Sequence, residues 1–98
     1  MTKLDATRDA ERRQVTVLFC DLVGSTELAN AIDPEDMGEF IRHFQDTCAG
    51  AIARFDGFVA KFMGDSVLAY FGYPLAHEDA VGQSVRAALA IVESIAHD

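Results

Sequence analysis

The chain lacks any long hydrophobic run. Half of its 98 residues are hydrophobic (50%), yet no uninterrupted apolar segment reaches the roughly 18 residues that cross a bilayer. The first ten residues are polar and lack the character of a secretory signal. We therefore expect a cytoplasmic protein with no membrane segment in this chain.

Basic residues are also scarce. Eight Lys and Arg stand against sixteen Asp and Glu, and the net charge is −8 at pH 7. Because nucleic-acid binding depends on a broad positive surface, this balance argues against a nucleic-acid partner. The acidity would suit a protein that binds divalent cations, and solubility alone explains it about as well.

Cysteine is rare and does not occur in a metal-binding pattern. Cys20 lies in an apolar run and Cys48 on a predicted helix, and neither belongs to a CxxC pair or a Cys/His group with zinc spacing. We expect two buried thiols in a reducing compartment, rather than a disulfide or a metal site.

The length suits one domain with a marginal core. Residues 1–12 are charged and aperiodic, which predicts a flexible N-terminal segment before a fold that occupies residues 13–98. No internal repeat or low-complexity tract divides the chain.

The first predicted strand is residues 14–23, a β-type run that is apolar on both faces in its second half. This pattern is typical of a central strand. The run reaches Asp21 and leads into a loop, residues 22–26, which combines a glycine with two hydroxyls before a helix-like segment at 27–31. Such a loop can direct backbone N–H groups at a phosphate, and simple helix capping explains it about equally well.

Two longer helices are predicted from apolar residues at helical spacing. The first begins with Asp33 as N-cap and Pro34 at the first helical position, and Gly57 is the expected stop. The second opens at residues 77–79, whose acids we assign to capping rather than to a metal. The apolar stripe of the first, which we expect to pack on the sheet, is Met37, Phe40, Ile41, Phe44, Cys48, Ala51, Ile52 and Phe55. The apolar stripe of the second is Val81, Val85, Ala88, Leu89, Val92 and Ile95.

Residues 61–71 are predicted to form most of a β-hairpin with an acid at its tip. Gly64 provides the backbone freedom of a tight turn between two β-type runs, Asp65 follows it, and Lys61 lies on the first run. Taken singly, Asp65 could stabilise the turn and Lys61 could extend from a sheet edge.

The element order β-α-α-β-β-α predicts an α+β fold resembling half of a ferredoxin-like fold, with helices packed on a small antiparallel or mixed sheet. In that arrangement Asp21 and Asp65 could converge. Two carboxylates and a neighbouring backbone carbonyl form a hard, oxygen-rich site for Mg²⁺ or Mn²⁺. Two such ions can act on one phosphoryl centre, with the loop at 24–26 holding the phosphates.

Two blocks of the sequence closely resemble class III adenylate/guanylate cyclases, especially bacterial multidomain ones. The first block is residues 19–26 and the second is residues 57–80, and the resemblance covers roughly residues 12 to 96. It implies that residues 13–98 are the N-terminal half of a cyclase catalytic domain with the cyclase homology fold. The implied activity is an adenylate cyclase, a phosphorus-oxygen lyase that converts ATP to 3′,5′-cyclic AMP and pyrophosphate in signal transduction.

The resemblance also implies a role for each matching residue. Asp21 and Asp65 match the catalytic aspartates that bind two Mg²⁺ or Mn²⁺ ions, and Leu22 matches the position whose backbone carbonyl also binds metal. Lys61 matches the base-selecting lysine of adenylyl-specific members, where guanylyl-specific members usually have Glu. Family enzymes are head-to-tail dimers with the site at the interface, so Lys61 would serve the metals of the other subunit in a homodimer. The implied triphosphate-binding turn is Val23, Gly24, Ser25 and Thr26.

The chain departs from the family pattern at its C-terminal side. Members complete the site with a second base-selecting residue and an Asn-x-x-x-Arg pair, whereas here Asn30 is the single asparagine and Arg86 is the only Lys or Arg after Lys61. We therefore expect little or no activity from these 98 residues alone. An alternative is a cyclase-homology module used for dimerisation or regulation without turnover. A diguanylate cyclase or polymerase-palm relative is disfavoured because the Met-Gly-Asp-Ser turn lacks a second acid.

Overall fold

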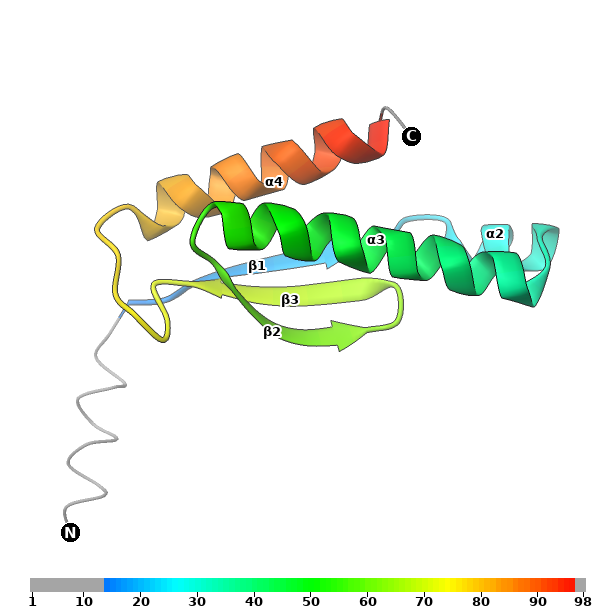
Figure 1. The fold of residues 1–98 in the computed structure, drawn as a ribbon, viewed down its shortest axis with the longest axis horizontal. Helices are drawn as coiled ribbons and strands as arrows, with labels where there is room; N and C mark the ends of the chain where they lie inside the picture. Colours follow the sequence, from blue (N-terminus) through cyan, green and yellow to red (C-terminus); the bar gives the residue numbers. More distant parts are fainter. Residues whose placement is uncertain (1–13, 97–98) are drawn as a thin grey trace, which may run out of the picture.

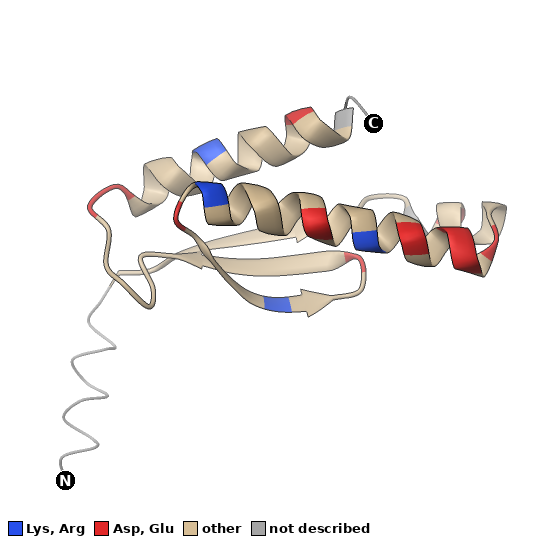
Figure 2. Cartoon of the chain, in the orientation of Figure 1, with Lys and Arg blue, Asp and Glu red and all other residues tan. Residues whose placement is uncertain are grey.

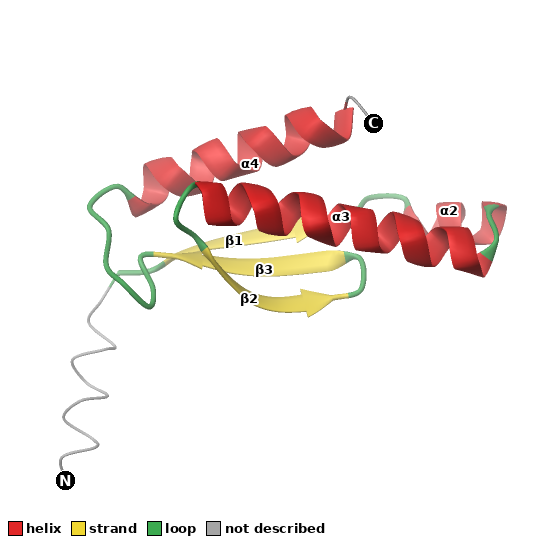
Figure 3. Ribbon diagram, viewed as in Figure 1, coloured by secondary structure: helices red, strands yellow, loops and turns green. Residues whose placement is uncertain are grey.

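The computed structural model describes residues 14–96, which fold as a small antiparallel sheet with two long helices on one face (Figure 1). The predicted order β-α-α-β-β-α and the α+β class are confirmed (Figure 3). The N-terminal segment at 1–12 lies outside the described residues. The elements are β1 (Thr16–Asp21), α2 (Ser25–Ala31), α3 (Pro34–Arg54), β2 (Phe58–Met63), β3 (Ser66–Phe71) and α4 (Ala80–Ala96).

The strand order is β1-β3-β2, and both pairings are antiparallel. β3 is therefore the central strand of the described sheet, and the prediction of a central β1 is wrong for this part of the chain. The apolar residues on both faces of β1 have another cause: Leu18 packs against the core, whereas Val17 and Phe19 are 57% and 53% exposed on the face that the helices leave uncovered.

The core lies between the sheet and the two long helices. α3 contributes three residues of its predicted stripe, which are confirmed as buried, while Phe40 of the same stripe is 37% exposed. Alternate residues of β3 face these helices, because successive side chains of a strand point to opposite faces. The buried hydrophobic residues are Phe44, Cys48, Ile52, Val67, Ala69, Phe71, Ala87 and Ile91.

The apolar stripe predicted for α4 is mostly not the face that packs on the sheet. Val81, Leu89 and Val92 are 65%, 64% and 66% exposed, whereas Ser84, Ala87 and Ile91 are buried. Small side chains let the helix approach β1 and β3 closely, and the Ser84 hydroxyl is satisfied by donating to the Val81 carbonyl at 2.7 Å. α4 thus has two apolar faces and packs through the one with smaller residues. None of the helices in the described part of the chain is long and apolar enough to cross a membrane.

The two ends of α3 follow different rules. Asp33 is confirmed as the N-cap, since its side chain accepts a hydrogen bond from the Glu35 amide at 3.5 Å. At the other end the chain leaves the helix through Asp56, with φ 66°, and not through a positive-φ Gly57. Gly57 is required for close approach: a β-carbon there would lie 2.6 Å from the Phe71 ring and 2.7 Å from an Ile52 methyl group.

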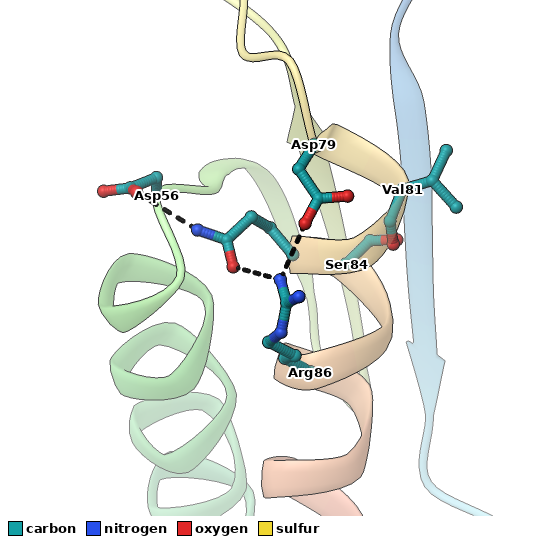
Figure 4. Close-up of polar contacts among 6 residues, drawn as sticks. Asp56, Asp79, Val81, Ser84 and Arg86 are labelled. Atoms are coloured by element: carbon teal, nitrogen blue, oxygen red, sulfur yellow. Dashed lines mark hydrogen bonds and ion pairs between the residues drawn. The ribbon is translucent and has the colours of Figure 1, made fainter.

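A polar network joins the end of α3 to the start of α4 (Figure 4). The side-chain amide of Gln83 donates to the Asp56 carboxylate at 3.3 Å. Arg86 donates to the side-chain carbonyl oxygen of Gln83 at 2.8 Å and to the Asp79 carboxylate at 3.0 Å. The backbone carbonyl of Asp79 accepts the first helical hydrogen bond of α4 from the backbone amide of Gln83 at 2.9 Å, so α4 begins directly after residues 77–79, whose capping role stays a prediction.

Candidate active site

The hairpin turn lies beside the end of β1, and this places the two predicted aspartates together. Asp21 is the last residue of β1 and pairs with Ser66, the first residue of β3. The next residue, Leu22, donates its amide to the Asp65 carbonyl at 3.0 Å. One end of the sheet therefore brings together Asp21, Leu22 and Asp65, three residues that the sequence assigned to one site.

The turn itself is fixed by glycine and by α3. Met63 and Ser66 pair across a two-residue turn in which Gly64 has φ 59°, the glycine-first form that suits the twist of a hairpin. The Gln45 side chain of α3 donates to the Gly64 carbonyl at 2.9 Å. Asp65 is thus carried on a short turn that the neighbouring helix holds in place.

Ser66 is a site residue that the sequence analysis did not single out. Its hydroxyl donates a hydrogen bond to a carboxylate oxygen of Asp21. The strand register is what identifies Ser66, because an antiparallel pairing that ends at Asp21 places the residue after Asp65 directly opposite Asp21. The register is a long-range property that a single sequence does not specify here.

The loop predicted at 22–26 is shorter in the structure, because α2 begins at Ser25, two residues before the predicted start. Gly24, with φ 83°, is the N-cap of α2, and as a glycine it cannot accept a hydrogen bond through a side chain. Val23 is 95% exposed. A hollow of about 340 Å³ lies between α2, α3 and the hairpin turn. Its lining residues are Thr26, Ala29, Asn30, Met37, Ile41, Gly64 and Asp65.

Lys61 lies on β2 at the uncovered face of the sheet. Lys61 pairs with Leu68 and Leu68 pairs with Phe19, so these three side chains lie on one face of the sheet. Asp21 lies two residues after Phe19 on β1, so it is on the same face. A register irregularity between Val59 and Lys61 sets this alternation. Figure 2 shows this basic position on β2 as separate from the acid at the hairpin turn.

The uncovered face of the sheet is apolar and aromatic. Phe19 and Phe58 are 53% and 43% exposed, and Tyr73 makes edge-to-face contacts with Phe58 and Tyr70 at centroid distances of 6.0 and 5.8 Å. Both long helices lie on the opposite face (Figure 1). Exposed apolar patches of this kind are typical of interaction surfaces.

Cys20 precedes Asp21 and packs against the core on the covered face of the sheet; it is only partly buried, so the prediction of two buried thiols is confirmed for Cys48 alone. The hydrogen bond with Cys48 lowers the pKa of Cys20, and burial opposes that effect. The same hydrogen bond, together with burial, raises the pKa of Cys48.

The residues at the hairpin end supply some, but not all, of the ligands that a hard divalent cation needs. It offers two carboxylates and neighbouring backbone carbonyls, all oxygen donors of the kind that Mg²⁺ and Mn²⁺ prefer. Among the described residues no group of three or more His, Cys, Asp or Glu could hold a metal. The remaining ligands would have to come from water and substrate phosphates, as is common for Mg²⁺.

Comparison with known proteins decides the family. The family profile for the adenylate and guanylate cyclase catalytic domain matches residues 8–98. The chain belongs to this cyclase family. The cyclase resemblance recognised in residues 19–26 and 57–80 is therefore confirmed.

Individual relatives of this cyclase chain agree with the assignment. It is 38% identical over 86 residues to an adenylate cyclase of Streptomyces coelicolor, a match that covers 88% of the chain. It is 42% identical over 89 residues, 91% of the chain, to an uncharacterised protein of Rhizobium meliloti. The chain spans only 21% and 9% of these two proteins.

Solved cyclase structures share the fold. The adenylyl cyclase CyaB from P. aeruginosa matches with a TM-score of 0.80 at 24% identity, over 85% of this chain and 43% of that one. The guanylate cyclase domain of RhGC from Catenaria anguillulae, solved with GTP, matches with a TM-score of 0.79 at 25% identity, over 85% and 46%. Because cyclases of both base specificities match, the fold does not decide between ATP and GTP.

Proposed function

We propose that this cyclase chain is the N-terminal half of an adenylate cyclase catalytic domain, which converts ATP to 3′,5′-cyclic AMP and pyrophosphate in the parent protein. The observation that carries the proposal is the meeting of Asp21 and Asp65 at one end of the sheet, through the Asp21–Ser66 pair and the bond from the Leu22 amide to the Asp65 carbonyl. Two carboxylates brought together by elements far apart in sequence suit a metal-dependent phosphoryl reaction.

In this proposal Asp21, Asp65 and the backbone carbonyl of Leu22 hold two Mg²⁺ or Mn²⁺ ions. When bound, the ions supply activation of the attacking hydroxyl and neutralisation of charge on the leaving pyrophosphate. The Ser66 hydroxyl orients the Asp21 carboxylate. Residues 23–26 bind the triphosphate through backbone amides, and the hollow that Thr26 and Asp65 line leaves space beside Asp65.

We assign Lys61 to base selection, with adenine as the expected base. Its position on the uncovered sheet face supports a site completed by a second copy of the domain. In the proposed homodimer, the exposed Phe19 and Phe58 are buried, and Lys61 reaches the nucleotide held by the partner's metal site.

These 98 residues alone are expected to have little or no turnover. The chain spans under half of each solved cyclase described above, and the second base-selecting residue and the Asn-x-x-x-Arg pair have no counterpart in it. Loss of each transition-state donor typically lowers the rate by about 10²- to 10³-fold.

A cyclic-nucleotide assay of the complete catalytic domain, with ATP and with GTP in Mn²⁺, tests the proposal. We expect cyclic AMP from ATP, and its loss in the Asp65→Ala variant. We further expect Lys61→Glu to weaken the preference for ATP; an unchanged preference would refute the role given to Lys61.

The second candidate is a cyclase-homology module that dimerises or regulates without turnover. The exposed aromatic face around Phe58 and Tyr73 favours it, because that face could serve association alone. A complete domain that dimerises normally and forms no cyclic nucleotide would establish this candidate and sink the adenylate cyclase proposal.

A further inference from the structure

The hairpin turn that carries Asp65 is bonded from two sides. The backbone amide of Leu22, which follows β1, donates to the Asp65 carbonyl at 3.0 Å. The side-chain amide of Gln45 donates to the Gly64 carbonyl at 2.9 Å, from α3 where that helix passes over this end of the sheet (Figure 1). Two elements far apart in the sequence therefore bond to successive carbonyls of one turn.

These two bonds restrain both peptide units that flank the Cα atom of Asp65. A peptide unit is planar, so the carbonyl oxygen of one residue moves together with the nitrogen and Cα atom of the next. The bond to the Gly64 carbonyl restrains the unit before Asp65, and the bond to the Asp65 carbonyl restrains the unit after it. Gly64 has φ 59° and the wide backbone freedom of a glycine, so the turn depends on such bonds for its shape.

α3 gives Gln45 a firm base. Phe44 and Cys48, on either side of Gln45 along the helix, are 4% and 0% exposed, so α3 is held in the core at this point. Ile41, one helical turn before Gln45, lines a hollow together with Asp65. Because residues four apart share a helix face, the face of α3 that carries Gln45 is the one beside the turn.

We propose that Gln45 is a positioning residue for the candidate metal site: its side-chain amide sets the backbone of Asp65, and with it the direction in which the carboxylate is offered to a cation. The consequence for the cation rests on the proposed function, whereas the restraint on the turn does not. The bond is exposed to solvent, so water can replace the Gln45 amide at the Gly64 carbonyl. Its loss should therefore loosen the turn without unfolding the chain.

The test variant is Gln45→Met, which has a side chain of similar length and no donor. Hydrogen exchange of the metal-free full chain, followed by NMR, measures how often the turn opens, because the Leu22 amide is bonded to the Asp65 carbonyl. We expect the Leu22 amide to exchange about two- to tenfold faster in the variant, as for the loss of one hydrogen bond, and the amides of β3 to exchange as in the wild type.

Gln83→Met is the matched control. It makes the same chemical change to a glutamine whose side-chain amide donates to Asp56 at 3.3 Å, at the other end of α3. We expect exchange of the Leu22 amide to be unchanged in this variant. Wild-type exchange of the Leu22 amide in Gln45→Met would overturn the proposal.

Titration calorimetry with Mn²⁺ separates positioning of Asp65 from simple support of the fold. Gln45→Met should bind Mn²⁺ about tenfold more weakly than the wild type, as for other residues that orient a metal ligand, while Gln83→Met keeps the wild-type affinity. Faster exchange with wild-type affinity would also overturn the proposal. A wild-type chain that binds no Mn²⁺ would count against the proposed function, and the exchange comparison would still decide whether Gln45 positions Asp65.

Discussion

The two ends of the sheet are built for different purposes. At the hairpin end, Asp21 and Asp65 lie on adjoining segments, and Ser66 is hydrogen-bonded to Asp21. At the opposite end, Gly57 fits against Phe71 and Ile52 with no space for a β-carbon, and a polar network ties α3 to α4. Packing explains the second end, whereas two acids carried on adjoining segments of the first offer oxygen ligands to a cation.

The largest expected effect is at the hairpin end. Asp65→Ala in the complete domain should lower the rate of cyclic AMP formation by at least about 10²-fold, because a ligand of the metal ions is removed. The midpoint of thermal unfolding without metal should change little, because the turn is held through the backbone carbonyls of Gly64 and Asp65, which the alanine variant keeps. If Asp65→Ala instead destabilised the fold while its folded fraction kept full activity, Asp65 would have a structural role and not a catalytic one.

At the packing end, Gly57→Ala should lower the free energy of unfolding by about 3 kcal/mol, because the added methyl group meets a buried ring and a buried methyl group. Urea unfolding of the full chain measures this. Gly50→Ala is the matched control: nothing lies within 4 Å of its β-carbon position in α3, so alanine should stabilise the chain by up to about 1 kcal/mol. Equal effects of the two changes would contradict the steric account.

Ser66→Ala sharpens the comparison within the hairpin end. Loss of the hydroxyl that bonds Asp21 should weaken Mn²⁺ binding by about 10- to 100-fold, as for other residues that orient a metal ligand. Ser66→Thr, which keeps the hydroxyl, should retain most of the affinity. Titration calorimetry with Mn²⁺ separates the two, and identical affinities for Ser66→Ala and wild type would remove Ser66 from the site.

The smallest effect is expected for Arg86→Ala. Its bonds to Asp79 and Gln83 are at the surface, where the arginine and aspartate side chains are 53% and 63% exposed. Such exposed pairs contribute about 1 kcal/mol or less, so the unfolding free energy should fall by no more than that. Mn²⁺ affinity should stay unchanged, and a parallel loss of affinity would show that the two ends are coupled.

The hairpin and the buried side of α3 could be predicted because both depend on local signals. Gly64 between two β-type runs gives the turn, and residues such as Phe44 and Ile52 recur at helical spacing on a helix with one clear apolar face. The convergence of Asp21 with Asp65 required only the order of elements and an antiparallel sheet.

The buried side of α4 could not be predicted by the same rule. The larger residues Val85 and Leu89 define the stronger stripe in sequence, yet the smaller Ser84 and Ala87 allow the closer approach to the sheet. Periodicity identifies an apolar face and does not say what covers it. The place of β1 at the sheet edge and the role of Gly57 likewise depend on neighbours distant in sequence.

The central claim, that Asp21 and Asp65 form one divalent metal site, is tested most directly by Mn²⁺ titration calorimetry of the full chain and of its Asp21→Ala and Asp65→Ala variants. We predict saturable binding by the wild-type chain and loss of that binding in each single variant, with the far-UV circular dichroism spectrum preserved. Equal Mn²⁺ affinity of the wild type and Asp21→Ala would contradict the claim.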